Sequence, residues 1–108
     1  MNAWTFLFIA GVCEIGWPLG FKLANDFLNL RWGFIAFSVV SMILSGFFLF
    51  LAQRHIPIGT AYAVWTGIGA VGTFIVGVFL FKDPMMVSRL LGISLIIAGV
   101  MILKFTAV

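Results

Sequence analysis

A single acidic residue, Glu14, stands inside an apolar stretch near the start of the sequence, "GVCEIGWPLGFK". An ionised group at bilayer depth costs roughly 2.5 kcal/mol or more, so acids inside apolar helices are rare and usually functional. No basic residue lies at a comparable depth, since Lys22 and Arg31 fall at the boundary of the stretch. An acid without an internal base suits the binding of a cation from outside, or of a proton in its absence. The alternative is a protonated carboxyl group that hydrogen-bonds to a neighbouring helix.

Aromatic and hydroxyl side chains at helical spacing could complete a cation site around Glu14. Trp17 follows this residue by three positions and therefore shares its helix face. In a later segment, "GTAYAVWTGIGAVG", the spacing also places Tyr62, Trp65 and Thr66 on one face. A phenol, an indole and a hydroxyl group supply hydrogen bonds and ring faces for a cation. Helix packing through small residues, with hydroxyl groups bonded to their own backbone, is the alternative.

The composition indicates that membrane helices position these residues. Of the 108 residues, 64% are hydrophobic and 8% are charged, against about 25% charged residues in soluble domains. So short a chain could not bury this much apolar surface in a water-soluble core. A spanning helix needs about 20 apolar residues, and the charged residues interrupt the chain at about that interval. We predict an all-α membrane protein with a single four-helix transmembrane domain over residues 1–108, with spans at residues 3–21, 32–52, 58–81 and 85–103.

Charge and cysteine content argue against several other classes of protein. The net charge of +3 suits contact with anionic lipid headgroups and gives no argument for nucleic acid as a partner. The single cysteine, Cys13, excludes an internal disulfide and is too little for a metal cluster. We expect no enzyme, no catalytic residue, no metal and no cofactor.

The basic residues specify the orientation in the membrane only weakly. Four lie on one predicted side and two on the other: Lys22, Arg31, Lys82 and Arg89 against Arg54 and Lys104. So small a bias permits insertion both ways, and a protein inserted both ways could pair antiparallel with itself. Four helices are few for a transport pathway, so we expect an oligomer. Gly92 and Gly99 offer a close-packing interface for it, or they reflect only the frequency of glycine in membrane helices.

Glycine and proline positions predict where the helices deform. Gly67, Gly69 and Gly72 make the third span bendable, because glycine weakens helix order and is a kink site. Tight helix packing is an equal alternative for these glycines. Pro18 removes the hydrogen bond that its position would donate to the carbonyl of Glu14 and crowds that carbonyl. We therefore expect a kink in the first helix beside the acid.

With Glu14 in the first span and "PIGTAYAVWTGIGAVG" in the third, the chain resembles the small multidrug resistance family over essentially its whole length. Trp17 and the wording "GTAYAVWTGIG" are similar to the guanidinium-exporter subtype of that family. The resemblance implies an antiparallel homodimer of dual topology in the cell inner membrane. It also implies proton-coupled export of guanidinium ion and small substituted guanidinyl cations.

The resemblance also assigns residues to the site. Glu14 would bind guanidinium or protons, and Trp17 would orient its carboxylate by hydrogen bonding. Ser45 matches a second-helix serine of the same network, and Tyr62 and Trp65 match aromatic residues near the site. A planar guanidinium pairs bidentately with a carboxylate, as arginine does. The residues expected in supporting places are Gly11, Thr60 and Thr66.

Pro18 departs from the pattern of the subtype and lies one turn from the acid, so it bears on the range of substrates. A broader exporter of quaternary ammonium and other hydrophobic cations is therefore an alternative. A second alternative is one subunit of a paired, heterodimeric transporter. The expected partners are protons, a small cation, the bilayer and a second copy of the chain.

Overall fold

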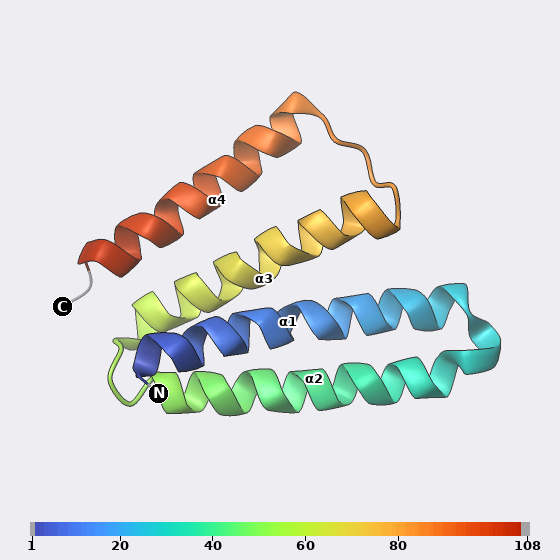
Figure 1. The fold of residues 1–108 in the computed structure, drawn as a ribbon, viewed down its shortest axis with the longest axis horizontal. Helices are drawn as coiled ribbons and strands as arrows, with labels where there is room; N and C mark the ends of the chain where they lie inside the picture. Colours follow the sequence, from blue (N-terminus) through green and yellow to red (C-terminus); the bar gives the residue numbers. More distant parts are fainter. Residues whose placement is uncertain (1, 107–108) are drawn as a thin grey trace.

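A computed structural model describes residues 2–106 and shows that part of the chain as a set of long helices (Figure 1). The helices are α1 (Ala3–Asp26), α2 (Arg31–Ala52), α3 (Ile58–Leu80) and α4 (Val87–Thr106), with a 3-10 turn, η1 (Leu28–Leu30), before α2. All four α-helices are long and apolar enough to cross a membrane. The predicted all-α membrane class is confirmed.

The ends of two helices differ from the expected spans. α1 continues past Phe21 to Asp26, and in this extension Lys22 and Asp26 lie one turn apart and form an ion pair with 3.5 Å between Nζ and Oδ1. The helix is therefore longer than the expected span and includes both charged residues. α4 begins at Val87 and ends at Thr106, slightly later at both ends than the apolar run in the sequence indicates.

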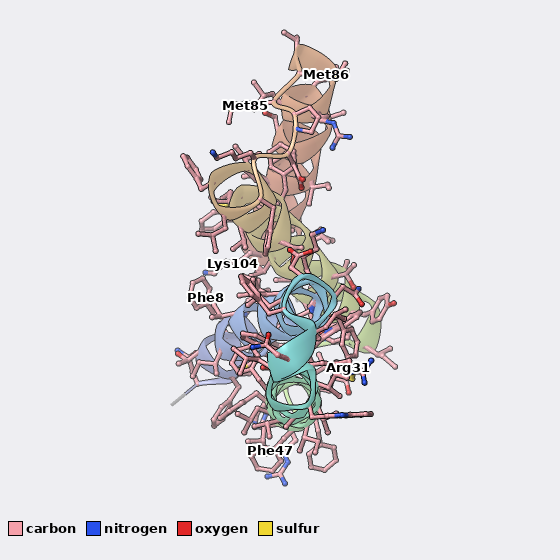
Figure 2. The ribbon with its side chains drawn as sticks, turned by 90° about the vertical axis from the view of Figure 1, so that its right-hand side faces the viewer. Phe8, Arg31, Phe47, Met85, Met86 and Lys104 are labelled. Atoms are coloured by element: carbon pink, nitrogen blue, oxygen red, sulfur yellow. The ribbon has the colours of Figure 1, made fainter. Side chains whose placement is uncertain are left out.

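The helices lie in a row in the order α2, α1, α3, α4 (Figure 1), and Figure 2 shows the same order in a view along the helices. α1 packs against both α2 and α3, whereas α4 packs mainly against α3 and also reaches α1, where the Lys104 ammonium lies 5.3 Å from the centroid of the Trp4 ring. The radius of gyration is 14.9 Å, against about 13 Å for a compact domain of this length. A single chain is therefore an open, splayed bundle. Apolar side chains such as Phe8 and Phe47 point away from it.

Small residues bring α1 and α2 close together. The Ser38 hydroxyl donates to the main-chain carbonyl of Trp17 at 2.8 Å. A methyl group on Gly20 would overlap Ser38, and one on Gly16 would lie 2.5 Å from the hydroxyl oxygen of Ser41. Lipid tails are as apolar as the helices, so close packing and interhelical hydrogen bonds drive association in a membrane. The α1–α2 pair uses both.

The glycines expected to bend α3, Gly67, Gly69 and Gly72, all lie against side chains of other helices. α3 is continuous from Ile58 to Leu80. A methyl group on Gly67 would lie 2.5 Å from a side-chain carbon of Val100 in α4, and one on Gly72 would overlap Ile15 in α1. These contacts favour the packing alternative, and a role of the glycines in helix flexing stays a prediction.

The contacts of a single chain do not test two other predicted features, the dimer interface and the kink in the first helix. No atom of the described chain lies within 4 Å of a methyl group built on Gly92 or Gly99, so their role in a dimer interface stays a prediction. Pro18 lies inside α1 without ending it. The helix is continuous through this residue, and the kink expected beside Glu14 stays a prediction.

The contact between α1 and α2 can be tested by adding one methyl group. Gly20→Ala should lower the stability of the protein by about 1–3 kcal/mol, because the methyl group forces Ser38 away from α1. Gly46→Ala is the matched control, since no atom lies within 4 Å of a methyl group at that position in α2. The measurement is thermal unfolding in detergent, followed by tryptophan fluorescence. Equal melting temperatures for the two variants would contradict the close contact.

Candidate functional site

The Glu14 carboxylate lies half-buried in the middle of α1, and its two hydrogen bonds with described residues both go to the same oxygen. The indole Nε1 of Trp17 donates to Oε1 at 2.6 Å, and the hydroxyl oxygen of Ser45 lies 3.4 Å from the same atom. Within residues 2–106, no side chain or backbone group donates to Oε2, and no lysine or arginine nitrogen lies within 4.0 Å of the carboxylate. One oxygen is therefore held in place, while the other keeps its capacity to accept hydrogen bonds from a ligand.

Ser45 connects the acid to two further helices. Its buried hydroxyl donates to the carbonyl of Ala10 in α1 at 2.8 Å and accepts a bond from the indole Nε1 of Trp65 in α3 at 2.8 Å. A hydroxyl group has a single proton, so the bond to Ala10 competes with the longer approach to Glu14. The chain from Trp65 through Ser45 to α1 fixes the three helices around the acid.

Two glycines let α1 and α3 approach each other at the level of the acid. A methyl group on Gly69 would lie 2.6 Å from Cγ of Glu14, so the bare backbone of α3 accommodates the acidic side chain. One on Gly11 would lie 2.6 Å from a side-chain carbon of Ile68. Gly11 therefore supports the packing of the two helices and does not face the carboxylate.

A cavity of about 520 Å³ opens beside Glu14, between α1, α3 and the start of α4. Its polar and charged lining residues are Glu14, Trp17, Thr66, Thr73, Asp83 and Arg89. Such a volume falls within the range of small-molecule sites, which combine apolar walls with a few polar groups. A cavity of about 580 Å³ beside Leu19 and Phe37 has no charged residue in its lining. The chemistry favours the cavity at the acid.

The structure brings most of the residues predicted for the site together. Hydrogen bonds join four of them: Glu14, Trp17, Ser45 and Trp65. The Tyr62 ring lies beside that of Trp65, with 5.5 Å between ring centroids and a tilt of 49°, and Tyr62 is 58% exposed. Thr66 lines the cavity. Thr60 lies half-buried in the first turn of α3 and is not part of the cavity lining.

Several residues near the site were not predicted from the sequence. The Ser38 hydroxyl donates a hydrogen bond to the carbonyl of Trp17. Ser38 could have been predicted from the sequence, because it precedes Ser45 by seven residues and this spacing places both on one helix face. Thr73 follows Thr66 by the same interval. Asp83 and Arg89 line the cavity only because of the path of the chain between α3 and α4, and no spacing rule indicates that path.

The interaction of Ser45 with Trp65 can be measured by a double-mutant cycle. Ser45→Ala and Trp65→Phe should each destabilise the protein, and the double variant should lose about 0.5–1.5 kcal/mol less than the sum, because the two residues share one hydrogen bond. Ser94→Ala is the control, since the Ser94 hydroxyl bonds only to the carbonyl of Leu90 in its own helix. Unfolding by denaturant in detergent gives the free energies. Additive losses would mean that the bond contributes nothing.

Comparison with known proteins yields one family and several relatives of nearly equal length. The family model described as Small Multidrug Resistance protein matches residues 2–96. A guanidinium exporter of Yersinia pseudotuberculosis is 44% identical over 105 residues, which cover 97% of this chain and 99% of that protein. Guanidinium exporters of Citrobacter freundii and Klebsiella oxytoca are each 43% identical over 104 residues, which cover 96% of this chain and 97% of each relative.

Proposed function

Because this chain belongs to the Small Multidrug Resistance family, we propose that it exports guanidinium ion and small substituted guanidinyl cations in exchange for protons. Its family and its four membrane-length helices make it a multi-pass protein of the cell inner membrane. The observation that carries the proposal is the Glu14 carboxylate, held by Trp17 through Oε1 and open at Oε2. The naming of relatives at 43–44% identity as guanidinium exporters supports the same substrate.

The geometry of the acid suits a planar cation with several donors. A carboxylate has lone pairs on both oxygens and can accept two parallel N–H bonds from one guanidinium group. The indole of Trp17 occupies only part of the capacity of Oε1 and limits the rotation of the carboxylate about its last bond. A bidentate pair then costs less entropy to form, because one partner is already oriented.

Competition between the cation and a proton supplies the exchange. A protonated Glu14 has lost the negative charge that pairs with guanidinium, so one carboxyl group binds either a proton or the cation. A carrier that changes the side of access only with one of the two bound therefore exchanges them across the membrane. We propose that two antiparallel copies form this carrier, because one chain leaves α4, as described, without a single buried residue. Transport, and not catalysis of a reaction, is the proposed activity.

A second candidate function follows from the aromatic pair. The rings of Tyr62 and Trp65 lie 5.5 Å apart, and aromatic faces attract quaternary ammonium ions, which have no N–H group to donate. A broader exporter of such cations would use these rings more than the hydrogen-bonded face of Glu14. A subunit that needs a different partner chain is the other alternative, and activity of the purified single protein would exclude it.

Replacing the acid by its amide tests the exchange. In liposomes that contain the purified protein, a guanidinium gradient should drive a proton flux, and Glu14→Gln should reduce it to the level of protein-free liposomes, because the amide neither ionises nor pairs with a cation. Asp26→Asn, the same chemical change at the end of α1, should retain the flux. Flux in Glu14→Gln equal to the wild type would refute the mechanism.

A comparison of cations separates the two candidate functions. The wild type should respond more strongly to guanidinium than to tetramethylammonium in the same electrical measurement on reconstituted membranes. Trp17→Phe should raise the half-saturation concentration of guanidinium about tenfold, because it removes a hydrogen bond to a charged group, and should affect tetramethylammonium less. An equal or larger response of the wild type to tetramethylammonium would favour the broader exporter.

A further inference from the structure

Two charged side chains stand at the mouth of the Glu14 cavity and have no role in the mechanism proposed above. Asp83 lies between α3 and α4, and Arg89 lies in the first turn of α4. Both side chains are exposed, and both line the same cavity of about 520 Å³ as Glu14. Any cation that reaches Glu14 from this end passes through a space that carries one fixed negative charge and one fixed positive charge.

The end of α3 fixes the position of the Asp83 carboxylate. The carbonyl of Gly77 accepts bonds from the backbone N–H of Phe81 at 3.1 Å and of Asp83 at 3.0 Å. Lys82, between them, has a φ of 56°, in the left-handed region that reverses the chain. The Asp83 side chain then lies on the bare face of Gly77, where a methyl group would overlap its Oδ2. The acid is folded back over the last turn of α3 and toward the cavity.

This carboxylate has no fixed cation as a partner. No lysine or arginine nitrogen lies within 4.0 Å of Asp83 in the part of the chain that the structure describes. Lys22 borders a small cavity of about 130 Å³ together with Asp83, but its ammonium group pairs with Asp26. The end of α3 is also the negative end of the helix dipole, where an anion is unfavourable. A cation bound at Asp83 would neutralise its charge and would also interact favourably with the negative end of the helix dipole.

Arg89 carries the same chemical group as the proposed substrate. Its guanidinium lines the cavity without forming an ion pair within 4.0 Å to either acid, among the residues described. A cation fixed at this place repels an incoming cation.

We infer that Asp83 and Arg89 tune the affinity of the Glu14 cavity with opposite signs. Asp83 is an outer carboxylate that holds an entering cation before it reaches Glu14, and Arg89 is a fixed positive charge that weakens the binding of the cation by repulsion. The inference rests on the proposed function, since it concerns how the same cavity admits its substrate. Both side chains are exposed, so their effects are strong at low ionic strength and are screened by salt.

Four variants test the inference by the half-saturation concentration of guanidinium in proteoliposomes at low salt. Asp83→Asn should raise this concentration by about threefold to tenfold, and Arg89→Gln should lower it by a similar factor. Asp83→Glu keeps the charge and should stay near the wild type. Arg31→Gln is the control for the lost arginine, because Arg31 stacks 5.0 Å from the ring of its neighbour Trp32 and does not line the cavity.

Salt distinguishes charge effects from damage to the fold. In 1 M salt, where the Debye length is about 3 Å, the differences between Asp83→Asn, Arg89→Gln and the wild type should largely disappear. Opposite shifts that vanish with salt would establish the inference. Unchanged half-saturation concentrations, shifts of the same sign in both variants, or shifts that persist in high salt would overturn it.

Failure of this inference and failure of the proposed function give different results. If wild-type flux is present and depends on Glu14 while the four variants are equal, only the inference on Asp83 and Arg89 is wrong. If the wild type transports tetramethylammonium and not guanidinium, the proposed substrate is wrong, and the same variants are titrated with tetramethylammonium, because the two charges act on any monovalent cation. If neither cation is transported, both proposals fail.

Discussion

The hydrogen bond from the Trp17 indole to the Glu14 carboxylate is the interaction on which the rest of the site depends. An acid in an apolar helix is costly unless its charge is bonded or neutralised, and Trp17 supplies a short bond from the same helix, one turn away. Because both residues belong to α1, this bond does not require the other helices to be in one fixed position. The acid keeps one satisfied oxygen while its surroundings change, which suits a group that exchanges ligands.

The remaining bonds join the acid to its neighbours through small residues. Ser45 reaches α1 from α2, and Trp65 reaches Ser45 from α3. These approaches are possible because glycine and serine stand where α1 meets its two neighbours, with Gly69 directly beside the acid. The same small residues therefore serve packing and chemistry. A larger side chain at such a position would disturb the helix contact and the position of the carboxylate together.

α4 has a different place in the molecule. In the described chain it packs mainly against α3, and no described atom lies within 4 Å of a methyl group built on Gly92 or Gly99. The side of the cavity that α4 helps to form is also the side with the charged residues Asp83 and Arg89. The strongly bonded part of the site thus lies between α1, α2 and α3, while its open part lies next to the helix with the fewest neighbours. A second copy of the chain would act on the open part first.

By itself, the sequence determined the four membrane helices, the acid and its tryptophan, because hydropathy and helical spacing are local properties of the chain. Helical spacing also indicated Tyr62 and Trp65, and the resemblance to a known family indicated Ser45. The tertiary structure decided which groups share a space: Ser38 beside the carbonyl of Trp17, and Asp83 and Arg89 beside Glu14. It also showed that Gly67 and Gly72 meet side chains of other helices. These contacts depend on how helices far apart in the sequence pack and on one left-handed residue after α3, and no pattern within a single helix specifies either.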